Sequence, residues 1–275
     1  MSIFRKIRKF YQIFADKSIK KGEVLNDRYE VLKIIGAGSY GMVYLCIDLE
    51  TKENRVIKQL RPSKRRNQKV VKMFENEISV LRKLTHRNIP IFYEAFLNNG
   101  HFFYVMGLIE GDNLEDQIFF SNKTFNEKES LLILLQLIKL IDYLHKKDIY
   151  HQDLRIPNIL LKNKELFLID FGLSKQRISV YPFHSSSSSS LTKQKDILEI
   201  TQQDYFDLGE ILLYLLYTTY SSTNKKALPW TEELSLEKET VHLLKRLLQI
   251  EQPYSNITEI STDIQAALVK HQKSS

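Results

Sequence analysis

The sequence is poor in the features that mark secreted, disulfide-rich or membrane-spanning proteins. Its 275 residues contain one cysteine, Cys46, so an internal disulfide is excluded and a reducing compartment is expected. We interpret Cys46 as a small buried residue of a strand. The most apolar run, residues 131–141, is too short to span a bilayer and is interrupted by Gln136 and Lys139. The N-terminus has no uninterrupted apolar stretch of the secretory kind. These absences predict a globular cytoplasmic protein.

Charge of one sign is in modest excess. Forty Lys and Arg residues face 33 Asp and Glu residues, a net charge of +7. Such an excess is compatible with several acidic partners and selects none of them. The sequence has no zinc-type Cys/His spacing and no basic-aromatic RNA-binding signature, so no nucleic-acid partner is expected.

Residues 1–25 form a basic N-terminal extension. Apolar residues recur there at helical spacing, with cations largely between them. They are Ile3, Phe4, Ile7, Phe10, Tyr11 and Phe14, and the cations are Arg5, Lys6, Arg8 and Lys9. One interpretation is an amphipathic helix over residues 1–22 that makes a peripheral contact with an anionic membrane. The other is that the same stripe packs on the protein's own domain.

The rest of the chain changes its periodicity once. Strand-like alternation over residues 29–35, 42–47, 54–60, 89–96 and 102–108 surrounds one helix, with apolar positions at Val70, Phe74, Ile78 and Leu81. Beyond residue 114 the pattern is helical. A capping box of Thr124 with Glu127, or of Asn126 with Glu129, begins a long helix, and further helices are predicted over 205–219 and 236–250. The pattern predicts an α+β protein with an antiparallel β lobe over 26–107 and a mostly helical lobe over 108–275.

Residues 173–203 lose this periodicity. They include six consecutive serines at positions 185–190. A serine tract has little apolar surface to bury, so we expect a mobile loop there.

A glycine-rich turn, Gly36-Ala-Gly-Ser-Tyr-Gly41, separates the first two strand-like runs. Dinucleotide-binding proteins use similar glycines, but a helix follows them there, whereas an alternating strand follows here. A Walker loop is excluded because no Gly-Lys-Ser/Thr ending is present. The arrangement predicts a flap whose backbone N–H groups lie over phosphates.

Two charged residues follow the flap. Lys58 lies on the third strand and is suited to neutralise phosphate oxygens. Glu77, in the next helix, is expected to hold the Lys58 ammonium in an ion pair, with Glu75 as the rival carboxylate.

Two oxygen-rich clusters lie in the second half. His151-Gln-Asp-Leu-Arg-Ile-Pro-Asn158 provides Asp153 to orient a hydroxyl proton and Asn158 to ligate a hard cation. Asp170, in Asp170-Phe-Gly172, ends an apolar run and suits Mg²⁺ bound to substrate phosphates.

The order of these four clusters resembles the protein kinase family over residues 28–260. The resemblance implies a bilobal fold, ATP as phosphoryl donor, and Mg²⁺ or Mn²⁺ held by Asn158 and Asp170. It implies Asp153, Lys58, Glu77 and Arg155 as catalytic residues. The nucleotide-binding residues that it implies are Ile35, Gly36, Ala37, Gly38, Ser39, Tyr40, Gly41, Val43, Val56, Lys58, Met106, Gly107, Ile109 and Leu160. The segment Asp204-Tyr-Phe-Asp-Leu-Gly209 is similar to the start of the family's central helix.

The sequence also departs from the family pattern. Gln152 stands where regulated kinases carry the Arg that pairs with a phosphorylated activation loop, so this kind of switching is not expected. Arg155 replaces the Lys of most Ser/Thr kinases, and some tyrosine kinases have Arg at this place, so these residues leave the choice between Ser/Thr and Tyr acceptors open. The Ala-Pro-Glu segment that shapes the peptide-binding ledge is missing, and Gln252 replaces its usual Arg partner. This compact form resembles small bacterial eukaryotic-like Ser/Thr kinases.

The expected function is therefore phosphorylation of Ser/Thr hydroxyls of proteins, including the chain itself. Two alternatives to a protein kinase also stay open at this point. One is a phosphotransferase that acts on a small molecule, because the peptide ledge is missing. The other is a non-catalytic nucleotide-binding scaffold.

Overall fold

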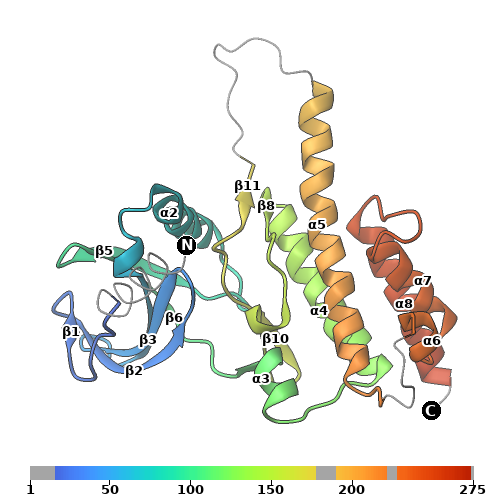
Figure 1. Ribbon diagram of the computed structural model, residues 1–275, viewed down its shortest axis with the longest axis horizontal. Coiled ribbons are helices and arrows are strands. Elements are labelled where there is room, and N and C mark those ends of the chain that lie inside the picture. The colour runs from blue at the N-terminus through green and yellow to red at the C-terminus, as the bar shows by residue number, and fades with distance from the viewer. Residues whose placement is uncertain (1–15, 178–189, 222–227, 274–275) are drawn as a thin grey trace, which may run out of the picture. The chain divides into compact units, whose positions relative to one another are not determined.

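The computed structural model describes residues 16–177, 190–221 and 228–273, and the chain divides into two compact units (Figure 1). Unit 1 comprises Met1–Glu110 and Asp170–Gly172, and unit 2 comprises Gly111–Ile169 and Leu173–Ser275. The apolar stripe of the N-terminal extension, residues 3–14, lies outside the described residues, so both interpretations of it stay predictions.

Unit 1 is built on a six-stranded antiparallel sheet with strand order β1-β2-β3-β4-β6-β5. The strands are β1 (Val24–Leu25), β2 (Tyr29–Ala37), β3 (Gly41–Asp48), β4 (Asn54–Leu60), β5 (Phe92–Asn98) and β6 (His101–Gly107). Alternating side chains of these strands form one core that includes Tyr29, Val31, Tyr44, Cys46 and Ile57. Burial raises the pKa of the Cys46 thiol to about 12, as befits a structural cysteine. The predicted strand over 89–96 begins later than expected, at Phe92.

The helix of unit 1, α2 (Gln68–Lys83), follows the short turn η1 (Pro62–Lys64). Asn67 caps α2, because its side-chain oxygen accepts hydrogen bonds from the Lys69 and Val70 N–H groups. The predicted apolar stripe is wrong at one position. Glu77, 3% exposed, lies on the buried face, whereas Ile78 is only half-buried. A buried carboxylate on this face requires a charged partner, which is described below.

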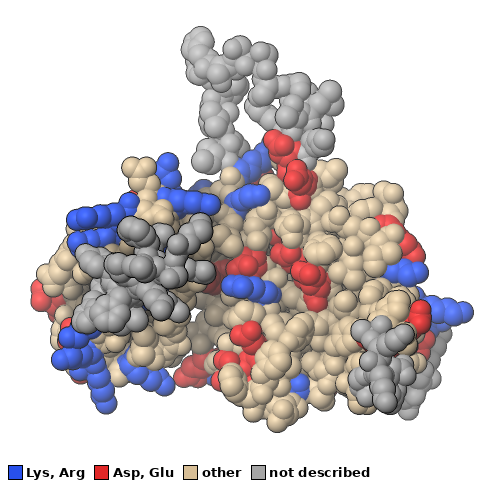
Figure 2. Space-filling view, in the orientation of Figure 1, with Lys and Arg blue, Asp and Glu red and all other residues tan. Residues whose placement is uncertain are grey.

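Exposed cations concentrate around the start of α2. Figure 2 shows Lys and Arg side chains gathered over this helix and the turn before it. They include Arg65, Arg66, Lys69 and Lys72. Part of the net positive charge is therefore concentrated on unit 1.

Unit 2 is mostly helical. Its helices are α3 (Leu114–Phe119), α4 (Glu127–His145), α5 (Ser190–Tyr217), α6 (Trp230–Glu233), α7 (Lys238–Leu247) and α8 (Ile257–Lys273). Short elements join them: β7 (Asp112–Asn113), β8 (Ile149–Tyr150), the turn η2 (Ile156–Asn158), β9 (Ile159–Lys162), β10 (Glu165–Leu168) and β11 (Lys175–Gln176). Of the two capping boxes that the sequence offered, Asn126 with Glu129 begins α4, and the inner face of α4 is almost entirely buried.

The helix α5 begins earlier than the sequence predicted. Residues 173–203 were expected to form a loop, but β11 pairs with β8 and α5 begins at Ser190. The prediction is therefore wrong for residues 190–203, and residues 178–189 lie outside the described residues. Tertiary contacts hold the helix around residues 200–202, where the Gln152 amide donates to the Ile200 carbonyl and the Gln202 amide donates to the Tyr254 carbonyl. The turns that precede them extend an existing helix, which avoids the cost of nucleation.

Two helices of unit 2 approach closely at a glycine. A Cβ atom placed on Gly209 of α5 would lie 2.9 Å from the Cβ of Leu247, at the end of α7. Glycine at this position permits the close approach of α5 and α7 (Figure 1).

Within the described parts of the chain, no helix combines the length and the apolar character needed to cross a membrane.

Candidate active site

The glycine-rich turn lies at the tip of the β2–β3 hairpin in unit 1. Residues 38–40 connect the strands, and the Gly38 N–H donates to the Gly41 carbonyl at 3.0 Å. A Cβ on Gly41 would lie 3.1 Å from the Gln59 carbonyl oxygen and 3.2 Å from Cε of Lys58. Glycine at position 41 therefore leaves room for the lysine side chain below the turn.

Lys58 of β4 lies between two carboxylates. Its Nζ is 2.7 Å and 2.9 Å from the two oxygens of Glu77 on α2, and 3.4 Å from Oδ1 of Asp170. The rival carboxylate, Glu75, is exposed on the other face of α2. The expected ion pair between Lys58 and Glu77 is present, and Asp170 joins it within unit 1.

Opposing effects act on the protonation of this cluster. Burial by itself lowers the pKa of Lys58, but the Glu77 and Asp170 carboxylates outweigh it, so the pKa is raised. Burial raises the pKa of Glu77, and the Lys58 ammonium opposes this shift. The bidentate contact of Lys58 with Glu77 favours the charged pair.

Asp170 presents its carboxylate to solvent. Its side chain is 44% exposed, and its backbone is left-handed, with φ of 65°. The Gly172 N–H donates to Oδ1 at 3.0 Å. Burial alone would raise the pKa of Asp170, but Lys58 and the Gly172 N–H lower it. An ionised, accessible carboxylate on a strained backbone is a suitable ligand for a hard cation.

The nucleotide-binding residues that the resemblance implies lie on several elements of unit 1. Ile35, Ala37, Gly38, Ser39 and Tyr40 are exposed, whereas Gly36, Val43, Met106, Gly107 and Ile109 are half-buried and Gly41 and Val56 are buried. Val56 and Met106 are neighbours across β4 and β6. Leu160, on β9, is buried and belongs to unit 2.

The loop between β8 and η2 in unit 2 carries Asp153 and Arg155, and Asn158 is the last residue of η2. The Asn158 amide N–H group donates to the Asp153 carbonyl at 2.9 Å and to Oδ2 of Asp153 at 3.2 Å, while the Arg155 Nε lies 3.3 Å from Oδ1 of Asp153. The loop therefore holds the carboxylate in one orientation and leaves the amide oxygen of Asn158 as a ligand atom.

Two buried carboxylates of α5 hold the backbone of this loop, Asp204 and, through the Leu154 N–H, Asp207. Asp204 of α5 is fully buried and accepts hydrogen bonds from the His151 N–H at 2.9 Å and the Gln152 N–H at 2.8 Å. The His145 Nε2 lies 2.7 Å from Oδ2, the oxygen that also accepts the His151 N–H. From the sequence, Asp204 was noted only as the first residue of the segment 204–209, which resembles the start of the family's central helix. That position was the one sequence feature that could have pointed to its supporting role.

At the positions where the sequence departs from the family pattern, the structure has other contacts. The Gln152 amide donates to Asp204 at 3.2 Å besides its bond to the Ile200 carbonyl. Arg246, a residue that the sequence did not single out, donates to Glu259, Asp263 and the Gln252 carbonyl and stacks on Tyr254. Unit 2 thus contains a different set of bonds where the usual charged partners are missing.

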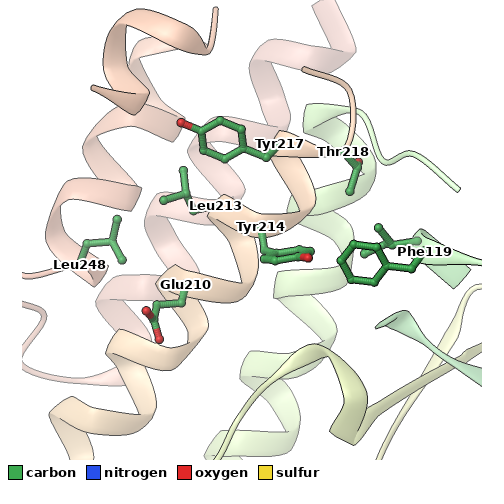
Figure 3. A pocket seen from close by; sticks show the side chains of 8 residues that line it. Phe119, Glu210, Leu213, Tyr214, Tyr217, Thr218 and Leu248 are labelled. Atoms are coloured by element: carbon green, nitrogen blue, oxygen red, sulfur yellow. The ribbon is translucent and has the colours of Figure 1, made fainter. Parts of the chain in front are cut away.

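An open groove lies elsewhere on unit 2, along α3 and α5 (Figure 3). Its lining is mainly apolar, and the edge of the Phe119 ring faces the ring of Tyr214. The lining residues are Ile118, Phe119, Glu210, Leu213, Tyr214, Tyr217, Thr218 and Leu248. None of them belongs to the clusters described above, so we assign the groove no part in phosphoryl transfer.

Among the residues that the structure describes, no group of three or more His, Cys, Asp or Glu side chains is arranged to bind a metal ion. A site for Mg²⁺ does not require such a group, because this ion keeps substrate phosphates and water as most of its ligands. The donor chemistry of Asp170 and Asn158 fits that ion.

Comparison with known proteins agrees with this geometry. Residues 29–268 match the model of the protein kinase domain. The chain belongs to the protein kinase family. It is 40% identical over 257 residues to the probable serine/threonine-protein kinase YbdM of Bacillus subtilis, and the match covers 94% of this chain and 96% of that protein.

Other kinases are longer than this chain. Serine/threonine-protein kinase D of Synechocystis is 31% identical, and the match covers 79% of this chain and 44% of that protein. Calcium-dependent protein kinase 4 of Plasmodium berghei is 32% identical, and the match covers 70% of this chain and 38% of that protein. The α+β architecture and the family resemblance are thus confirmed.

Proposed function

We propose that this kinase transfers the γ-phosphate of ATP to Ser or Thr hydroxyls of proteins, its own chain included, and that the reaction depends on Mg²⁺. The complete cluster of Lys58, Glu77 and Asp170 carries this proposal. Burying Glu77 is costly without a paired lysine, and such a pair is suited to hold a cation against phosphates. The similarity to serine/threonine-protein kinases supports the acceptor class.

Unit 1 supplies the groups that bind the nucleotide. The N–H groups of the turn from Gly36 to Gly41 cover the phosphates, and Lys58 neutralises them. Val43, Val56, Met106 and the backbone of Gly107 and Ile109 contact the adenine, and Ile35 borders it. Glu77 keeps Lys58 in place, so these groups require little reorganisation during the reaction.

Unit 2 supplies the groups that act on the acceptor. Asp153 aligns the hydroxyl and accepts its proton, and Arg155 steadies the transferred phosphoryl group with a permanent positive charge. The acceptor oxygen bonds to the γ-phosphorus, the bond from that phosphorus to the bridging oxygen breaks, and ADP leaves. Leu160 adds an apolar contact for the adenine.

Asp170 and Asn158 would hold Mg²⁺. When bound, the ion neutralises charge on the β- and γ-phosphate oxygens. Asp170 is ionised at neutral pH because Lys58 and the Gly172 N–H stabilise its charge.

A small-molecule acceptor is the second candidate. The observation that favours it is the helix α5, which occupies residues 190–203 in place of the family's peptide ledge. The 40% identity to a probable protein kinase over nearly the whole chain favours the protein acceptor.

Transfer of ³²P from labelled ATP, followed by mass spectrometry, tests the proposal. We expect Mg²⁺-dependent label on Ser or Thr of the protein itself and of added protein substrates. Asp170→Asn should lower the rate at least about 10²–10³-fold, because it removes a preorganised charge. Asp196→Asn, an exposed carboxylate of α5, is the matched control and should leave the rate unchanged. Label on a metabolite alone, or equal rates for Asp170→Asn and wild type, would overturn the proposal.

Two predictions about location rest on the sequence alone. A cytoplasmic protein and a peripheral contact with anionic lipid through residues 1–22 remain proposals. Sedimentation with anionic and neutral vesicles, with and without residues 1–15, tests the second.

A further inference from the structure

The segment that precedes the first strand is attached to the sheet of unit 1. We call residues 16–23 the N-terminal strap. Gly22 and Glu23 exchange hydrogen bonds with Val31 of β2, at 2.8 Å and 2.9 Å. Ile19 packs against the core of the sheet, and its N–H donates to the Tyr44 hydroxyl. The strap is therefore a fixed part of unit 1.

Asp16 at the start of the strap is a buried acceptor. Its side chain is 7% exposed. It accepts hydrogen bonds from the Ser63 N–H at 2.9 Å, the Ser63 hydroxyl at 2.9 Å and the Arg61 Nη1 at 3.0 Å. A carboxylate with three donors, one of them charged, fixes the segment just after β4 and orients the Arg61 guanidinium.

The other side of Arg61 faces the glycine-rich turn. Its Nε donates to the Gly38 carbonyl at 2.6 Å, and its backbone N–H donates to the Tyr40 carbonyl at 2.9 Å. One residue thus bonds to two of the three residues at the tip of the hairpin. The same guanidinium joins Asp16 to Gly38.

The tip has few other restraints. Gly38, Ser39 and Tyr40 are exposed, and a Cβ on Gly38 would meet no atom within 4 Å. An exposed glycine-containing turn populates many backbone conformations, and ordering it on binding costs entropy. A guanidinium that is itself held by a buried carboxylate reduces that cost, because Gly38 and Tyr40 are fixed before the ligand binds.

We propose that Asp16 and Arg61 are positioning residues for ATP, which hold the glycine-rich turn in the conformation that receives the phosphates. The inference rests on the proposed function for the identity of the ligand. It adds that the N-terminal strap, which lies outside the matched kinase domain, contributes to nucleotide affinity. Neither residue touches the reacting atoms.

The test uses the full-length protein and two separate readouts. One is the affinity for a non-hydrolysable ATP analogue with Mg²⁺, measured by calorimetry. The other is the KM for ATP and the kcat of phosphorylation. We expect Asp16→Asn and Arg61→Ala each to weaken analogue binding and raise the KM about 5–10-fold, with kcat within about twofold of wild type. Asp16→Glu keeps the carboxylate and should restore most of the affinity.

A second ion pair of unit 1 provides the matched control. Arg28 donates to both oxygens of the buried Asp48 at 2.9 Å and 2.7 Å, and these contacts do not involve the glycine-rich turn. Arg28→Ala should lower the melting temperature as Asp16→Asn does, but leave analogue affinity unchanged.

The outcomes separate the two proposals. If wild type binds the analogue but transfers no phosphate, the proposed function fails and analogue affinity alone decides the inference. The inference is overturned if Arg28→Ala weakens binding as much as Asp16→Asn at an equal loss of melting temperature. It is also overturned if Asp16→Asn leaves the affinity unchanged, since the turn then needs no support from the strap.

Discussion

In unit 1 the ammonium of Lys58 is held by charged side chains, whereas in unit 2 the loop that carries Asp153 is held through its backbone. Glu77 contacts Lys58 with both oxygens. Asp204 instead accepts the N–H groups of His151 and Gln152 and does not bond to Asp153 itself. In unit 1 the position of one charged side chain is fixed by an opposite charge. In unit 2 the backbone conformation of a loop is fixed by hydrogen bonds to its N–H groups.

The difference extends to how each unit keeps or loses charge. Unit 1 keeps its buried charges in pairs, Lys58 with Glu77 and Arg28 with Asp48. Unit 2 has the amides Gln152 and Gln252 where the family usually has charged partners. Gln152 donates to the Ile200 carbonyl, and the Gln252 carbonyl accepts from Arg246. Losing both partners of a buried pair avoids leaving one charge unpaired. Unit 2 could therefore diverge without a lasting loss of stability, whereas a single change in the pairs of unit 1 leaves a buried charge.

The largest effect should follow from breaking the pair in unit 1. Lys58→Met should lower the rate at least about 10²–10³-fold, because a preorganised charge on the phosphates is lost. It should also destabilise the protein by about 3–5 kcal/mol, because Glu77 is left buried and unpaired. Adding Glu77→Gln should restore most of the melting temperature but not the rate. A double variant that regained activity would show that Lys58 acts only in folding.

Breaking the loop support in unit 2 should have a smaller effect of a different kind. Asp204→Asn replaces one acceptor oxygen by an NH₂ group, and we expect a loss of about 1–3 kcal/mol in unfolding free energy. The kcat should fall about tenfold or more, because Asp153 is misplaced. The affinity for the ATP analogue should stay within about twofold of wild type, since the nucleotide groups of unit 1 are untouched. Equal changes in kcat and analogue affinity would contradict this division of roles.

Sequence reasoning succeeded where chemistry and local spacing coincide. The strands of unit 1, the Asn126 capping box and the pairing of Lys58 with Glu77 follow from alternation, cap chemistry and charge. The catalytic roles assigned to these residues remain predictions. The prediction that Ile78 faces the core was wrong because it rested on apolar spacing alone. Glu77 is buried there instead, since Lys58 pairs with its carboxylate.

Contacts between residues distant in sequence could not be predicted. Gln152 and Gln202 donate to the Ile200 and Tyr254 carbonyls, which only the folded chain brings near, and these bonds hold part of the helix that the sequence pattern did not predict. The bridge from Asp16 through Arg61 to Gly38 spans 45 residues on one side and 23 on the other, and no periodicity marks it. The pattern identified Asp204 by family resemblance, but its hydrogen bonds required the structure.

A further comparison concerns pH, because unit 2 buries the Asp207 carboxylate, which forms no ion pair with the cations that the structure describes. Burial raises the pKa of Asp207 to about 6, and the nearby Asp204 and Glu210 add to the shift, while hydrogen bonds from Gln203 and the Leu154 N–H oppose it. A folded-state pKa above the unfolded value means that folding favours the protonated form. The associated stability is present at low pH and is lost as pH rises through about 6.

Asp207→Asn removes this dependence. Between pH 5 and 7.5 the unfolding free energy of wild type should fall by about 1 kcal/mol more than that of the variant. Melting temperatures across this range measure it, with Asp196→Asn as the control for a carboxylate at the surface of α5. Parallel curves for wild type and Asp207→Asn would mean that the carboxylate is ionised throughout.

The smallest expected effect concerns activation. In unit 2 the Gln152 amide bonds to the backbone of α5, and an uncharged amide cannot form the charge-assisted pair that a phosphorylated loop requires. We therefore expect that replacing the serines at positions 185–189 by alanine leaves the initial rate on an external substrate within about threefold of wild type, even where these serines accept phosphate. Ser190 is kept because α5 begins there. In the second arm, wild type is treated with phosphatase, and its initial rate should equal that of the untreated enzyme from the first minutes of the assay. A tenfold loss of rate in either arm would show that these serines control activity by a route that does not involve Gln152.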